Sequence, residues 1–187
     1  GFDPEARDAG IIRLEIPRPA WDSMQADPLA SWGSWVDGSL AYGGTTIPVR
    51  FRKRGDNSIH WLTDKRTLTV RTPRDEFYKQ YRSFALSVKD VLPAYLANRL
   101  AREFGLLAPT TEVAPVFLNN QFYGMFRFLE VVDESFLRPF DRMPGNIFRG
   151  DAAERGDYYK GVPRNLFENP YIWDRVAMND ATPGASA

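Results

Sequence analysis

Large apolar residues recur at every fourth position between residues 91 and 104, which is the clearest helical pattern in the chain. The repeat consists of Leu92, Leu96, Leu100 and Phe104. A helix places such residues on one side, so the pattern predicts an apolar stripe that packs against a sheet. Asp90 is suited to cap the first turn, and Gly105 is suited to end the helix. With Leu96 in the core, Leu96→Ala is expected to cost on the order of 2 to 5 kcal/mol.

Short β-strand patterns lie on both sides of this helix. Residues 47–54 alternate, with Val49 and Phe51 on one face and arginines on the other, namely Arg50, Arg52 and Arg54. Such a stripe either binds phosphate groups or, more commonly, pairs with carboxylates or lies in solvent. Further strands are expected at residues 11–16 and 65–71, and a hairpin at 113–118 and 122–130 with its turn at Asn119, Asn120 and Gln121.

The order of strands, helix and hairpin predicts an α+β fold, with a largely antiparallel sheet and one packed helix. Residues 20–46 and 138–187 are expected to form long irregular loops that carry many aromatic side chains. Loops of this length are usually functional or disordered, so we expect a larger partner to order them. The length predicts a single domain over residues 1–175, followed by a linker or a truncated continuation at 176–187.

The composition excludes several classes of function. Lys plus Arg is 24 and Asp plus Glu is 24, so no excess charge favours nucleic acid or an anionic membrane. No apolar run approaches the roughly 20 residues that span a bilayer. Cysteine is absent and His60 is the only histidine, which excludes disulfides, thiolate chemistry and the usual zinc sites.

Six segments, in order between residues 11 and 151, together form a family pattern. They are a strand and tryptophan-containing turn at 11–24, the turn RGDNS at 54–58, a lysine-bearing strand at 65–70, the helix LANRLAREFGLLAP, the hairpin FLNNQFYGMFRFLEVVDESFL and the turn GNIFRG at 145–150. In this order they resemble the N-terminal part of the CotH (spore coat protein H) kinase family.

The resemblance implies an atypical kinase fold in which this region forms the small lobe. It also implies ATP, a divalent metal, and a serine on a protein partner as the substrate. The residues that it assigns to cofactor binding are Lys65, Arg54, Glu130 and Asp133. A kinase lysine usually has a glutamate partner on the adjacent helix, and this chain has Ala94 at that position. The family's metal-binding and catalytic aspartates would lie after residue 187, and the family favours the cell envelope over the cytoplasm.

Three functions remain open. We favour a non-catalytic, CotH-like binding or assembly subunit of a larger complex, which has a protein partner, no nucleic acid and no transmembrane segment of its own. Peripheral membrane association through partners is compatible with it, and the chain alone is expected to show no kinase activity. The alternative is a fragment of an active CotH-type protein kinase that uses ATP with Mg or Mn. A third is a carbohydrate- or wall-binding module that uses exposed tryptophans such as Trp32, Trp35 and Trp61.

Overall fold

The structure, a computed structural model, describes residues 10–26, 33–42, 44–55, 64–133, 136–137, 140–141, 146–150 and 173–177. The chain divides into two units, Gly1–Val131 and Val132–Ala187, and each is described by itself. The predicted single domain over residues 1–175 stays a prediction.

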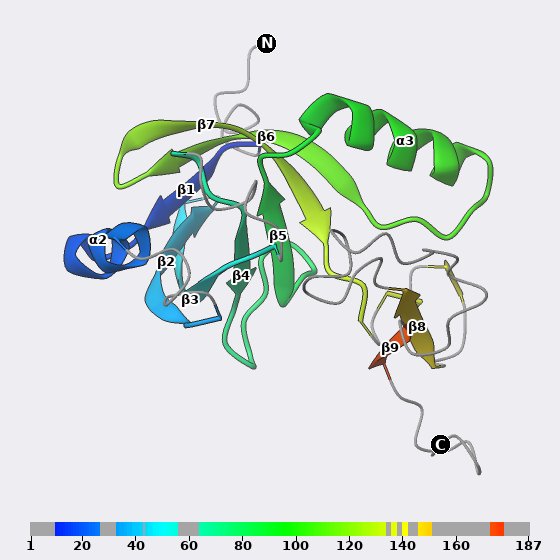
Figure 1. Cartoon of the computed structure of the whole chain (residues 1–187), viewed down its shortest axis with the longest axis horizontal. Helices are drawn as coiled ribbons and strands as arrows, with labels where there is room; N and C mark the ends of the chain where they lie inside the picture. Colours follow the sequence, from blue (N-terminus) through cyan, green and yellow to red (C-terminus); the bar gives the residue numbers. More distant parts are fainter. Residues whose placement is uncertain are drawn as a thin grey trace, which may run out of the picture. The chain divides into compact units, whose positions relative to one another are not determined.

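The first unit is a closed β-barrel whose strands neighbour one another in the order β1-β2-β3-β4-β5-β7-β6 (Figure 1). The strands are β1 (Ile12–Glu15), β2 (Val36–Tyr42), β3 (Thr45–Lys53), β4 (Leu68–Arg71), β5 (Ser83–Ser87), β6 (Thr111–Leu118) and β7 (Gln121–Glu130). Neighbouring strands pair antiparallel, except that β1 pairs with β6 in parallel, with Ile12 opposite Val116. This parallel pair joins the first strand to the hairpin and closes the barrel.

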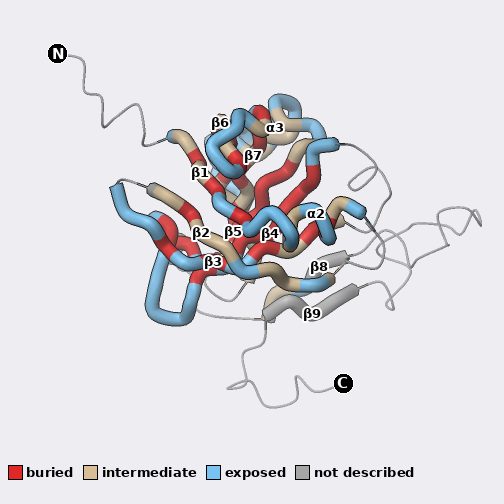
Figure 2. The backbone as a smooth tube through the Cα atoms, turned by 90° about the vertical axis from the view of Figure 1, so that its left-hand side faces the viewer, coloured by how far each residue is buried: buried red, intermediate tan, exposed pale blue. Residues whose placement is uncertain are grey.

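The alternation of apolar residues along each strand fills the barrel. In β3, Ile47, Val49 and Phe51 are buried while Arg50 is exposed. Figure 2 shows the buried positions running along the strands inside the barrel. An aromatic cluster lies at β5 and β7, where the rings of Phe84 and Phe128 are 4.9 Å apart and Tyr81 lies 5.2 Å from Phe128. Burial of such side chains is the main favourable contribution to the stability of the barrel.

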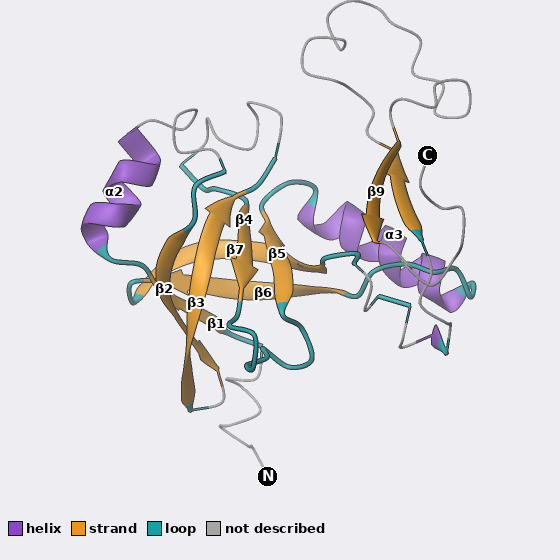
Figure 3. Cartoon of the chain, turned by 90° about the horizontal axis from the view of Figure 1, so that it is seen from below, coloured by secondary structure: helices purple, strands orange, loops and turns teal. Residues whose placement is uncertain are grey.

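The helix α2 (Arg18–Ala26) lies at one end of the barrel (Figure 3). Its Met24 side chain is buried, and its Trp21 ring meets the Tyr123 ring edge-on at 5.7 Å. The backbone carbonyl of Met24 accepts a hydrogen bond of 2.6 Å from the Nζ of Lys53, which is itself buried. The barrel end is therefore closed by a helix that is held by both apolar and polar contacts.

The helix α3 (Val91–Glu103) connects β5 to β6 and lies on the opposite side of the barrel from α2 (Figures 1 and 3). It contacts β6 and β7, but none of its residues is buried. Leu96 is 56% exposed, so the expectation that Leu96 lies in the core is wrong. Asp90 has a left-handed backbone (φ 47°) and its side chain makes no capping hydrogen bond, so the expected cap is wrong too. Gly105, with φ 74°, follows the end of the helix as expected.

The predicted α+β fold with a packed helix, resembling a kinase small lobe, is wrong, because the sheet closes into a mixed barrel and the helix stays outside it. Strand patterns show which residues share a face, but not that β1 joins β6 or that β5 lies between β4 and β7. The expected loop over residues 20–46 is corrected as well, since part of α2 and all of β2 lie there. The strand β2 contains Gly38 and Ser39, which have low strand propensity, and pairing with β1 and β3 decides its conformation.

The second unit contains a two-stranded antiparallel sheet, formed by β8 (Ile147–Gly150) and β9 (Trp173–Ala177). The rings of Phe136 and Phe140 meet edge-on at 5.4 Å. Most of the loop expected over residues 138–187, including the aromatic residues from 158 to 171, lies outside the described residues.

Candidate functional site

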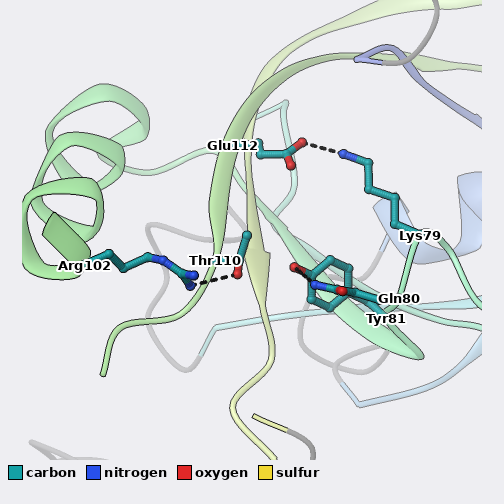
Figure 4. Close-up of a pocket in the computed structure, with 6 residues that line it drawn as sticks. All are labelled: Lys79, Gln80, Tyr81, Arg102, Thr110 and Glu112. Carbon is teal, nitrogen blue, oxygen red and sulfur yellow. Dashed lines mark hydrogen bonds and ion pairs between the residues drawn. The ribbon is translucent and has the colours of Figure 1, made fainter. Parts of the chain in front are cut away.

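A polar pocket of about 560 Å³ opens on the barrel near α3. It is lined by Lys79, Gln80, Tyr81, Arg102, Thr110 and Glu112 (Figure 4). These side chains come from three places that are distant in sequence, namely the turn before β5, the end of α3 and the start of β6. The pocket is open to solvent, and its lining offers both cations and an anion.

One wall of the pocket is a tight turn that holds Lys79. Tyr78 and Tyr81 exchange two backbone hydrogen bonds, of 3.0 and 2.8 Å, across this turn. Lys79 has a positive φ of 54°, which is a strained conformation for a residue with a side chain. The Nζ of Lys79 lies 2.7 Å from Oε2 of Glu112, so the turn holds a lysine in an ion pair at the pocket.

The opposite wall is a chain of hydrogen bonds that begins on α3. The Nη1 of Arg102 donates to the hydroxyl of Thr110 at 3.1 Å and to the carbonyl of Ala108 at 3.2 Å. The backbone N–H of Thr110 donates to Oε2 of Glu130 at 2.8 Å, and the backbone N–H of Glu130 donates to the carbonyl of Thr110 at 3.0 Å. The buried carboxylate of Glu130 therefore fixes the strand segment that carries the pocket residue Thr110.

Lys65 lies at the other end of β7. It is exposed, and its side chain lies over Gly124, where an added Cβ would come within 2.7 Å of the lysine Nζ. Glu130 lies six positions after Gly124 on an extended strand, which corresponds to about 20 Å. The structure thus places Lys65 and Glu130 at opposite ends of one strand and does not bring them together.

The other two predicted cofactor residues are Arg54, which pairs with the segment just after Lys65, and Asp133, which belongs to the second unit. Arg54 is half-buried, and its backbone N–H donates to the carbonyl of Thr67 at 2.9 Å. Asp133 belongs to the second unit, where its carbonyl accepts a hydrogen bond of 3.1 Å from the N–H of Phe136. The assignment of ATP contacts to Lys65, Arg54, Glu130 and Asp133 stays a prediction.

The segment that contains Lys65 is held by Tyr123. The Tyr123 hydroxyl accepts a hydrogen bond from the backbone N–H of Arg66 at 2.8 Å and donates one to the carbonyl of Asp64 at 3.1 Å. Burial raises the pKa of Tyr123 above its ordinary value of 10.0, because the phenolate would lose its hydration. The side chain of Arg66 is tied to α2, since its Nε donates to Oε1 of Gln25 at 2.6 Å.

The outer face of β7 carries Arg127 close to the start of α3. Burial lowers the pKa of Arg127, and the negative charge of Asp90 opposes this shift. The Nε of Arg127 is buried and has no hydrogen-bond partner among the described residues. The residue as a whole is half-buried.

The apolar stripe predicted at residues 91–104 is present on α3, but it is exposed instead of packed in the core. The stripe on α3 leaves Leu92 61%, Leu100 57% and Phe104 79% exposed, and Leu106 and Leu107 extend it beyond the helix. None of the residues of α3 is buried. The four-residue repeat that predicted a core helix therefore marks a surface, which we call the α3 face (Leu92, Leu96, Leu100 and Phe104).

The described residues offer neither a metal site nor a membrane-spanning helix. Within these ranges no group of three or more His, Cys, Asp and Glu side chains could hold a metal ion. No helix of the described chain is long and apolar enough to cross a membrane. His60 and Trp61 lie outside the described residues, and Trp32 does as well.

Neither a protein-family profile nor a curated protein sequence matches this chain. The resemblance to the CotH family stays a prediction.

Proposed function

We propose that the chain is a non-catalytic assembly module that binds another protein through the α3 face. The observation that supports this proposal is the exposure of four large apolar side chains, all above half, on one helix. Contiguous exposed apolar patches of this kind are typical of interaction sites in soluble proteins, whereas single exposed leucines need no explanation.

The energetics favour a bound state for this surface. Full burial of a leucine or phenylalanine side chain is worth about 1.5 to 3 kcal/mol. Covering four half-exposed side chains therefore supplies several kcal/mol toward association, which is the scale that an interface needs after its ordering costs. The spacing of four residues presents one ridge, and a groove or a second helix fits such a ridge.

The charges beside the α3 face indicate the chemistry of the partner. Arg99 is exposed between Leu96 and Leu100 in sequence and forms no ion pair with the described residues. A partner with an apolar segment bordered by carboxylates would match both the leucines and this arginine. We therefore propose that the protein bound at the α3 face has an apolar segment flanked by acidic residues.

The experiment uses a photo-crosslinking amino acid in place of Leu96 in cells that contain the full chain. A matched probe replaces Phe122, which is 60% exposed at the tip of the β6–β7 hairpin. We expect a defined cross-linked protein from the Leu96 probe that the Phe122 probe does not give. The captured protein is then purified, and its affinity for the chain is measured by calorimetry.

The affinity measurement decides the proposal. Leu96→Gln combined with Leu100→Gln is expected to weaken binding at least about tenfold, because two apolar anchors are lost. Phe122→Gln is expected to leave the affinity unchanged. Equal binding by the double variant contradicts the proposal. A cross-link to a second copy, with a dimer mass in solution, contradicts the choice of partner and identifies self-association instead.

A further inference from the structure

A cluster of three arginines surrounds a single tryptophan on the outer face of the barrel, away from the α3 face. The guanidinium carbons of Arg50, Arg52 and Arg71 lie over the Trp35 ring, at 5.5, 4.9 and 5.2 Å from its centroid. We call these four residues the Trp35 cluster.

The register of three neighbouring strands produces this cluster. Arg50 of β3 lies opposite Asp37 of β2 and opposite Arg71 of β4. Arg52 is two residues further along β3, so it points to the same outer face. Figure 3 shows β2, β3 and β4 side by side. Each of these strands is paired on both edges, so backbone pairing sets the positions of the arginines.

The Trp35 cluster has more positive than negative charge around it. Like charges directly opposite each other on paired strands are destabilising, and Arg50 and Arg71 form such a pair. Among the described residues, one carboxylate balances them, that of Asp37, which lies 3.5 Å from the Nε of Arg50 and is 91% exposed. Arg52 and Arg71 form no ion pair with described residues. The cluster therefore carries a net positive charge on a small area of surface.

The tryptophan gives this charge a defined geometry. A guanidinium over an indole face is held by the ring quadrupole, with a favourable energy of about 0.5 to 1 kcal/mol at exposed sites. A cation–π contact requires no hydrogen-bond acceptor, so it does not use up the N–H donors of the guanidinium groups. Such donors form the paired hydrogen bonds that suit a phosphate group.

We infer that the Trp35 cluster is a binding site for a phosphate group, either free or carried by a phosphorylated side chain. A dianion matches the excess charge better than a single carboxylate does, since Asp37 already supplies one carboxylate. Three guanidinium carbons lie within 5.5 Å of the Trp35 ring centroid, so a nucleic-acid base would have to displace arginines in order to stack on it. This site is independent of the α3 face and of the proposed assembly function.

The test is calorimetric titration of the full chain at constant ionic strength, with inorganic phosphate and with O-phosphoserine as probes. We expect saturable binding with one site per chain. Arg50→Gln combined with Arg71→Gln is expected to weaken it at least about tenfold, and Arg71→Lys about threefold, because lysine keeps the charge but loses the paired donors. Trp35→Ala changes no charge, and it is expected to weaken binding because the arginines lose their common support.

The matched control is Arg82→Gln, which removes the same charge from an arginine that lies over the lone ring of Phe77 at 4.9 Å. It is expected to leave the affinity unchanged. Tighter binding of phosphoserine than of phosphate would identify a phosphorylated partner as the source, and equal binding would identify free phosphate. Binding that does not saturate, or that falls equally in Arg82→Gln and in the double variant, overturns the inference. Melting curves of each variant establish that the barrel is folded.

Discussion

The carboxamide of Asn119 takes the place of a strand partner for Ile16, 103 residues earlier in the chain. Its Oδ1 accepts the backbone N–H of Ile16 at 2.9 Å, and its Nδ2 donates to the carbonyl of Ile16 at 3.0 Å. The backbone N–H of Asn119 donates to the carbonyl of Leu14 at 2.8 Å. One side chain in the hairpin turn thus extends the parallel pairing of β1 with β6, and it helps to close the barrel.

Asn119→Ala is expected to destabilise the barrel by about 2 to 3 kcal/mol, because two hydrogen bonds at about 1 kcal/mol each are lost and alanine is strained at a positive φ. Asn120→Ala is the matched control. Its φ is 63°, close to the 50° of Asn119, and its exposed side chain has no hydrogen bond among the described residues. Urea denaturation should show a loss of only about 1 kcal/mol for Asn120→Ala. Equal losses for both variants would mean that the carboxamide bonds contribute nothing.

The stability effects of two leucine-to-alanine substitutions should distinguish the barrel core from the α3 face. Leu14 is 1% exposed in β1, between Leu40 and Leu118, whereas Leu96 is 56% exposed on α3. Leu14→Ala is expected to cost about 2 to 5 kcal/mol, because it leaves a cavity at the closure of the barrel. Leu96→Ala is expected to change stability by no more than about 0.5 kcal/mol. A thermal melt in which Leu96→Ala is the more damaging change would contradict the exposed position of α3.

Alkaline pH is expected to destabilise the protein through Tyr123. Its pKa is raised by burial above the value of 10.0 that it has when exposed, so the folded state holds the phenol proton more tightly than the unfolded state. This contribution to stability is fully present below pH 10 and is lost as the pH rises through the folded pKa. Tyr123→Phe removes this titration, along with two hydrogen bonds. The difference in unfolding free energy between the native chain and Tyr123→Phe should therefore shrink above pH 10. A difference that stays constant to pH 11 would rule out this linkage.

Substitutions at Glu130 test the structural role of its buried carboxylate. Its buried side chain accepts the N–H of Thr110. Glu130→Ala is expected to cost about 1 to 3 kcal/mol, because that N–H loses its acceptor. Glu130→Gln keeps an oxygen in place and is expected to retain most of the stability. Guanidinium denaturation provides the measurement, and a similar large loss for both variants would show that the charge itself is required.

The amino-acid sequence determined the local elements of this protein. The alternation of arginines with apolar residues predicted β3, and the four-residue repeat predicted α3. The end of α3 was expected because Gly105 is a glycine. The hairpin turn was also predicted from the sequence, because Asn119 and Asn120 tolerate the positive φ values that they adopt. Each of these features depends on interactions within a few residues, so the local sequence contains the information.

The tertiary structure decided how these elements combine. The strands β2 and β5 have weak patterns of their own and form because neighbouring strands bond to both of their edges. The parallel pairing of β1 with β6 closes the sheet, and this leaves the apolar stripe of α3 outside the barrel rather than in its core. The Trp35 cluster and the Glu130–Thr110 bond likewise join residues from different strands. Periodicity shows which residues share one face of a helix or strand. Only the pairing of distant strands decides what packs against that face.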